Sequence, residues 1–303
     1  MYLGQRVTIG AVLETIYADN TAVAATDLFL ASDANIVPVA DKIDRPLQKA
    51  SISTMKHLIS REAWELTFTM EIKGDGTKYD ALFRAAGFSP SAEIYSPIST
   101  GWESLSVYVY AGGKLYKLKG GVVRQMEFVM EAGEIAKINF TVDGLYVRPT
   151  DVGIVTGTNY GTEVPPIVSN TACTIGSFAT GVIQACNIVV ANTVKKRLSV
   201  NSAFGVYGFQ ITGRNVTGTI NPEAVLEATQ SFWLNWETGV QEAFSIGLGS
   251  VDGNKWLISA PKLTKDNISP SDEDGIRTYT IPFTCHMSSG DDELTIDVHP
   301  PES

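Results

Sequence analysis

The chain has 303 residues, of which 44% are apolar and only 18% are charged. Its net charge of −10 argues against a protein whose main task is to grip nucleic acid, because that task needs an excess of Lys and Arg to neutralise phosphates. The length favours two globular units, and the low charged fraction, where about 25% is usual, predicts that association hides part of the surface.

The sequence also argues against a membrane protein or a secreted protein. No run of about 18 apolar residues occurs, so the sequence predicts no membrane-spanning helix. The start, residues 1–6, lacks the apolar core of a signal peptide, and we expect the protein to be made and to fold in a cytoplasm. Cys173, Cys186 and Cys285 are odd in number and widely spaced, which fits neither a disulfide framework nor a zinc site. We interpret them as buried free thiols.

Alternation of apolar and polar residues predicts that the first half is mostly antiparallel strand. The clearest strand covers residues 64–72, where every second side chain is large and apolar. A helix is predicted over residues 77–86, ending before Gly87, because its apolar residues fall at helical spacing. The same strand alternation returns at residues 105–109, 126–130 and 138–142.

In the second half, a helix is predicted from Asn221 to Gly239, since Asn221 is a good N-cap and Pro222 suits the first helical position. Its aromatic residues lie at helical spacing and fit either a packed core or the wall of a ligand groove: Phe232, Trp233 and Trp236.

Pro282, in the last predicted strand, has no N–H and so removes one hydrogen-bond donor from the strand ladder. We therefore expect that strand to be an edge, to be bulged, or to be paired on one side only at this residue.

Features of the first half return in the same order in the second half, about 140 residues later. The helical segment 81–85 matches residues 224–228, and the strand at 105–107 matches one at 244–246. A glycine-containing turn, an acidic turn and a final strand follow in both halves. This order predicts a tandem duplication.

The duplication sets the predicted domain boundaries. Residues 1–150 form a first domain and residues 167–303 form a second domain with an acidic, Pro-rich tail. Residues 151–166 are rich in Gly, Thr and Pro and lack a sustained apolar period, so they are predicted to be a linker.

Each predicted domain carries a long segment ahead of its main strand, residues 41–60 and residues 187–204, and such length in a paired position suggests a shared task. Both segments are basic within an acidic protein. They hold few aromatic residues for base stacking, which favours contact with protein over contact with nucleic acid. The candidate contact residues are Lys42, Arg45, Lys49, Lys56 and His57 in the first segment and Lys195, Lys196 and Arg197 in the second.

Residue patterns typical of catalysis or metal binding do not occur. His57, His286 and His299 stand outside any metal-ligand or nucleophile-activating motif. The acidic clusters at residues 272–274 and 291–293 fit either a hard cation or, more simply, solvated turns. We therefore predict no enzymatic activity, no cofactor and no metal.

Several ordered segments resemble the major tail tube proteins of long-tailed bacteriophages. They span nearly the whole chain, and it is their order rather than any one motif that carries the resemblance. The segments are residues 12–17, 25–27, 36–39, 81–88, 144–146 and 275–279.

The resemblance implies a structural virion protein assembled in the host bacterial cytoplasm. Its expected fold is mainly β, with two copies of a tail-tube-type β-sandwich or half-barrel domain, each with one flanking α-helix. Such subunits form sixfold rings that stack into a hollow tube, through which DNA passes without specific binding. Because this chain carries two copies where the usual subunit carries one, three chains would close a ring with pseudo-sixfold symmetry. The implied partners are other copies of the chain and the tape measure, tail terminator and distal tail proteins.

Under the same resemblance, the segments 41–60 and 187–204 match a loop that contacts the neighbouring ring. Closure of sheets into a ring also removes exposed strand edges, which can pair with other chains and cause aggregation in a monomer.

Two alternatives stay open from the residues alone. One is a two-domain β-sandwich adhesin or capsid-surface protein, and the other is a hydrolase whose site is not visible in the sequence.

Overall fold

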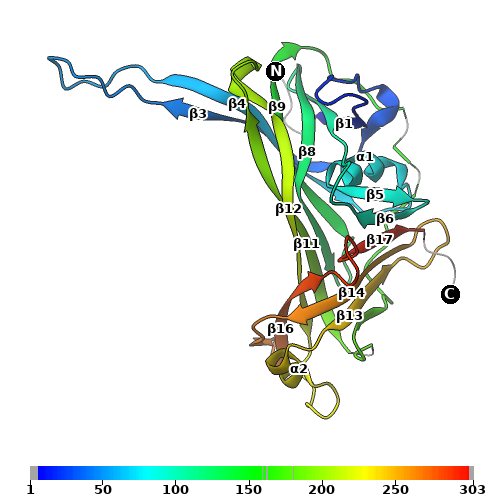
Figure 1. The fold of residues 1–303 in the computed structure, drawn as a ribbon. Helices are drawn as coiled ribbons and strands as arrows, with labels where there is room; N and C mark the ends of the chain where they lie inside the picture. The colour runs from blue at the N-terminus through cyan, green and yellow to red at the C-terminus, as the bar shows by residue number, and fades with distance from the viewer. Residues whose placement is uncertain (1–5, 159, 162, 180, 300–303) are drawn as a thin grey trace.

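The computed structural model describes residues 6–158, 160–161, 163–179 and 181–299, and it is built mainly from antiparallel strands (Figure 1). The described residues contain 17 strands and two α-helices, one helix in each half of the chain. This confirms the predicted mainly-β fold. No helix in these residues is both long and apolar enough to cross a membrane.

The first half begins with two short strands and continues through a long hairpin, a helix, two further hairpins and a return strand. Its elements are β1 (Val7–Leu13), β2 (Leu28–Phe29), β3 (Ser32–Ile43), β4 (Leu58–Glu71), α1 (Thr77–Ala85), β5 (Phe88–Ser91), β6 (Ile94–Pro97), β7 (Leu105–Ala111), β8 (Lys114–Glu131) and β9 (Lys137–Asp151).

The second half follows a similar order and ends in one extra strand. Its elements are β10 (Cys173–Ile175), β11 (Ile183–Leu198), β12 (Val206–Pro222), α2 (Phe232–Thr238), β13 (Glu242–Leu248), β14 (Trp256–Lys265), β15 (Ser269–Glu273), β16 (Ile276–His286) and β17 (Thr295–Val298).

Eight strands form a central antiparallel sheet in the order β3-β4-β9-β8-β11-β12-β16-β15. The halves meet inside this sheet, where β8 pairs with β11 from Gln125↔Ala191 to Glu131↔Ala185. Helix α1 and strands β5, β6 and β17 lie on one side of the sheet, while the opposite side carries no covering element (Figure 1). The central sheet therefore has one core face and one uncovered face.

The core follows the period-two pattern of the strands. Trp64, Leu66, Phe68 and Met70 of β4 are all buried, and the same alternation is buried in β8 and β9. This confirms the strands predicted at residues 64–72, 105–109, 126–130 and 138–142. One continuous core joins apolar residues of both halves.

Strand β8 takes part in two layers because it bends at Gly120, which has a positive φ of 57°. Before the bend it pairs with β7, and after the bend it pairs with β11. The buried carboxylate of Glu14 holds the bend, since it accepts hydrogen bonds from the Gly120 N–H (2.9 Å) and from the hydroxyls of Ser104 and Ser106 (2.6 Å each). One charged side chain thus satisfies the polar groups that the bend frees from the ladder.

The two halves repeat one set of strand pairings. In each half a hairpin precedes the helix, another hairpin (β7–β8 or β13–β14) follows it, and a return strand pairs with both of these hairpins, as β9 does with β4 and β8 and as β16 does with β12 and β14. The β5–β6 hairpin of the first half has no counterpart among the described residues of the second half. The short strands β1 and β10 pair with β7 and β13. Even the bulge recurs, between Leu105 and Val107 in one half and between Glu242 and Phe244 in the other.

The helix predictions have different outcomes. Helix α1 ends at Ala85 with Ala86 as its C-cap, and Gly87 follows as the predicted C′ residue, with a φ of +85° that only glycine adopts without strain. The predicted start of the second helix at Asn221 is wrong, because α2 begins at Phe232. The N–H groups of Glu223 and Ala224 donate instead to the carbonyls of Val182, just before β11, and Arg277 of β16, at 2.9 Å each, which extends the sheet. The match of segment 81–85 with 224–228 is therefore also wrong, since the latter lies outside the helix.

Pro282 confirms the expectation drawn from its missing N–H. It lies opposite Thr219 of β12, but on its other side the ladder is interrupted between β14 and β15. Only its carbonyl is used there, as the acceptor for the Asp266 N–H (2.8 Å).

Polar side chains tie the halves together across the sheet. Arg214 of β12 forms an ion pair with Glu293 and donates to the carbonyls of Gly87 and Ile98 (3.2 Å each) in the first half. Asn192 donates to two further carbonyls of the first half, at 2.8 and 3.0 Å. In the predicted linker, 151–166, β9 ends at Asp151 and no named strand follows among the described residues up to β10.

Candidate assembly surfaces

The first candidate surface is the pair of strand edges that end the central sheet. Strand β3 pairs only with β4, and β15 pairs only with β16, among the described residues. All residues of both strands are exposed or half-buried. Such edges present unpaired N–H and C=O groups to any strand that approaches.

The second candidate surface is the arm formed by the β3–β4 hairpin, which projects far from the body of the molecule (Figure 1). Its tip, residues 44–57, is exposed throughout. The hydrogen bonds and ion pairs that the tip forms with the described part of the chain stay within the arm, as in the Lys42–Asp44 ion pair (3.4 Å). The structure places Arg45, Lys49, Lys56 and His57 on this tip and Lys42 at its base.

The corresponding hairpin of the second half, β11–β12, instead lies against the first half. Phe204 at its tip meets Tyr146 edge to face, with 5.6 Å between ring centroids. Tyr207 stacks on Tyr17 (6.3 Å), and the Tyr17 hydroxyl accepts the Phe209 N–H (2.7 Å). Burial raises the pKa of Tyr17 above its ordinary value.

The basic residues of the second segment do not lie in a loop. Lys195, Lys196 and Arg197 belong to strand β11, so residues 187–204 are mostly strand rather than the projecting loop that the resemblance implied. The Arg197 guanidinium lies over the Tyr207 ring, 4.8 Å from its centroid. The structure therefore does not bring the two basic groups together, because one is on the free arm and the other on a packed hairpin.

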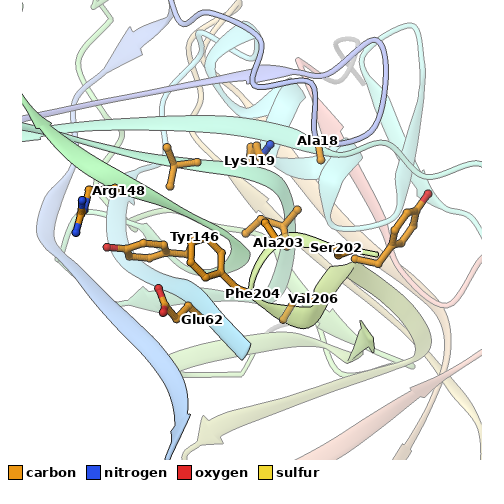
Figure 2. Close-up of a pocket in the computed structure, with 12 residues that line it drawn as sticks. Ala18, Glu62, Lys119, Tyr146, Arg148, Ser202, Ala203, Phe204 and Val206 are labelled. Carbon is orange, nitrogen blue, oxygen red and sulfur yellow. The ribbon is translucent and has the colours of Figure 1, made fainter. Parts of the chain in front are cut away.

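A groove of about 450 Å³ lies where this packed hairpin crosses the first half. Phe204 and Tyr146 meet in its centre, with Glu62 and Arg148 close by (Figure 2). Its lining comes from both halves, and its exposed lining is mainly apolar. The groove is thus part of the contact between the halves. The aromatic residues that build this contact were missed by the sequence analysis, since their partners are remote in sequence.

The third candidate surface is the uncovered face of the central sheet, which is acidic. Glu65, Glu127 and Asp143 project from it, and Arg124 forms ion pairs with Glu65 and Asp143. Asn139 donates to Glu127 (3.2 Å). Burial raises the pKa of Asp143, and Arg124 opposes that rise. Arg124 pairs with two of these three carboxylates, Glu65 and Asp143, and Glu127 has no ion-pair partner among the described residues.

The sequence and the structure together indicate a protein that assembles with other chains, and a comparison with known families shows which family it belongs to. A family model described as phage tail tube protein matches residues 4–285. The chain belongs to the phage tail tube protein family. A search among curated proteins finds no match. The family match includes both halves of the central sheet, and it makes the chain a structural component of the virion tail rather than an enzyme.

In this tail tube protein, two of the histidines and the acidic cluster at residues 291–293 contact polar groups of the fold. His286 lies 2.7 Å from the Thr264 hydroxyl, and His299 lies 3.1 Å from Glu93. Asp292 accepts the N–H groups of Ser288 (2.8 Å) and Ser289 (3.0 Å), which closes a turn. Within the described residues, no group of three or more His, Cys, Asp or Glu is arranged to hold a metal ion.

Proposed function

We propose that the chain polymerises into stacked rings that form the hollow tail tube, with three chains in each ring. Family membership and the two free sheet edges support polymerisation. The repeated strand pairings support two copies of one domain, so that each chain fills two of six similar places. Three eight-stranded sheets joined edge to edge would close a barrel and leave no free edge.

The test is the shape and stoichiometry of the purified protein. We expect hollow tubes by negative-stain electron microscopy and three chains per ring by native mass spectrometry of the ring intermediate. A stable monomer without tubes would support the adhesin or capsid-surface alternative instead. Tubes with six chains per ring would leave the tube function intact but contradict the duplicated-domain arrangement.

We also propose that the basic arm carries contacts between successive rings. Its exposed tip residues lie beyond the sheet, where they can reach a neighbouring acidic subunit. The candidate stacking residues are those on the arm, Lys42, Arg45, Lys49, Lys56 and His57, together with Lys195, Lys196 and Arg197 on β11. The further partners would be tape measure, tail terminator and distal tail proteins, and assembly would take place in the cytoplasm of the host.

The acidic uncovered face is proposed to line the bore. Carboxylates there would repel the phosphates of DNA in transit, the reverse of the attraction that basic proteins use. Glu71 of β4 is exposed and lies six residues after Glu65, so it belongs to the same face. We expect a Glu71→Lys/Glu127→Lys variant to form tubes that bind short duplex DNA at low salt and release it as the salt concentration rises. Fluorescence anisotropy of labelled DNA measures the binding.

The matched control reverses two charges on the covering layer, Glu237→Lys/Asp252→Lys. Control tubes should bind DNA no better than the natural protein. DNA binding by the control that equals binding by the Glu71→Lys/Glu127→Lys variant would contradict the proposed bore face, because the effect would then follow net charge alone.

A further inference from the structure

The two free edges of the central sheet correspond to two strands that are already paired inside it. Strand β3 holds in the first half the place that β11 holds in the second, and β15 holds the place of the C-terminal part of β8. The turns that follow β8 and β15 match as well, since Gly133 and Gly275 have φ values of +82° and +84°. The β8–β11 ladder is therefore a template for a β15–β3 ladder.

The outward-facing groups of β3 follow from the hydrogen bonds of β4. The Ile72 N–H donates to the Ala136 carbonyl (2.9 Å), and β4 pairs with β9 without a bulge. Even-numbered residues of β4 thus face β9, and odd-numbered residues face β3. Ile36 and Pro38 lie opposite even-numbered residues of β4, so their own backbone groups point away from the sheet.

The outward-facing groups of β15 follow in the same way. The Pro282 carbonyl accepts the Asp266 N–H, so even-numbered residues of β16 face β14 and β15. Ser269 and Ser271 lie opposite such residues and bond to β16. The backbone groups of Pro270, between them, therefore point outward from the edge.

We infer that β3 of a second copy pairs antiparallel with β15 in the register of the β8–β11 ladder. This inference rests on the ring proposed above and names the contact that closes it. The corresponding pairs are Ile36 with Pro270, as Ile188 with Phe128, and Pro38 with Ile268, as Val190 with Met126.

We call the β15–β3 pairing between chains the seam. Its two prolines make it weaker than the β8–β11 pairing within a chain. A hydrogen-bonded antiparallel pair normally has two N–H···O bonds. Pro270 and Pro38 have no N–H, so each of these pairs keeps one bond. Prolines on edge strands limit unspecific pairing of edges. Free subunits should therefore pair only weakly through these two edges. The seam forms when other contacts in the ring add to it.

A disulfide tests the register. Asn35 and Ser271 would lie opposite each other in a non-hydrogen-bonded pair, at a Cα separation of about 4.5 Å, which is within the range of about 4.4–6.8 Å for a disulfide. By strand alternation both side chains lie on the face of the sheet opposite its core, where Asn35 is exposed and Ser271 is half-buried. We expect the Asn35→Cys/Ser271→Cys variant to form tubes under reducing conditions and covalent trimers after mild oxidation, seen on a non-reducing gel.

The matched control is Val37→Cys/Ser271→Cys, in which the two residues lie diagonally, at about 7–8 Å, and should cross-link far less. Reduced tubes that yield only monomers on oxidation would overturn the register while leaving the tube function standing. Failure of the natural protein to form tubes would remove the proposed function, and the seam with it. Equal cross-linking of both variants would also overturn the register.

A second experiment tests whether the two prolines weaken the seam. Pro38→Val/Pro270→Phe places in the seam the residues found at the corresponding positions of β11 and β8. Each substitution restores one N–H, and we expect the critical protein concentration for tube formation to fall by about tenfold or more. An unchanged or higher critical concentration, measured by light scattering, would contradict the proposed restraint.

Discussion

Shortening the β3–β4 arm should give a folded subunit that forms rings but does not stack into tubes. The design replaces residues 44–57 by Asn-Gly, because Ile43 and Leu58 are the last paired residues of the hairpin and a two-residue turn can close it. The tip bonds only within the arm among the described residues. Its loss should therefore leave the melting temperature nearly unchanged, while sedimentation and electron microscopy show rings without tubes.

A milder variant separates the charges of the arm from its length. Arg45→Ala/Lys49→Ala/Lys56→Ala keeps the full arm, and we expect it to polymerise poorly and its remaining polymerisation to depend less on salt than that of the natural protein. As a control, the shortened subunit is co-expressed with the natural full-length chain from a second plasmid, which should restore tubes. Tubes of normal length from the shortened subunit would show that the arm has no part in stacking.

The second large effect concerns a buried ion pair beside helix α2. Lys265 and Glu242 are in contact, with 1% and 8% of their side chains exposed, and Glu242 also accepts a hydrogen bond from Asn235 (3.0 Å). The corresponding positions of the first half hold Val123 and Leu105, which are fully buried. Removing one partner leaves an uncompensated buried charge. Glu242→Leu should therefore lower the free energy of unfolding by about 3–5 kcal/mol.

The matched variant replaces both partners with the residues of the first half, Glu242→Leu/Lys265→Val. It should recover most of the lost stability, because no charge is left buried. Burial lowers the pKa of Lys265 to about 8, below its ordinary 10.5. In Glu242→Leu the unfolded state binds more protons in that interval, so stability should rise as the pH increases through it. Urea unfolding at several pH values measures this, and equal stability of both variants would contradict the argument.

The sequence was a good guide wherever a local pattern determines the structure. Alternation predicted β4, β8 and β9, because one face of each strand is buried and the side-chain period is two. It failed at α2, where a good N-cap and a proline predicted a helix from Asn221. The N–H groups of Glu223 and Ala224 bond there to the carbonyls of Val182 and Arg277, which are remote in sequence, and tertiary pairing overrides local preference.

The candidate surfaces were only partly visible from the sequence. The basic residues of the arm were predicted as candidate contact residues, and the structure places them at exposed positions of the arm. The packed hairpin was not foreseen, because Phe204 depends on Tyr146 and Tyr207 depends on Tyr17, and no periodic pattern records such partners. The β8–β11 pairing was equally hidden, since alternation gives the buried face of a strand but not its neighbour.

The β8–β11 ladder joins two sheet segments that belong to one polypeptide. In a ring of three chains, every second ladder of this kind would already exist when the subunit leaves the ribosome and folds, at a rate independent of protein concentration. Only three encounters would then remain for closure, where single-domain subunits need six. Nucleation of the first ring would depend on a lower power of subunit concentration, and tails could start at expression levels too low for an unlinked subunit.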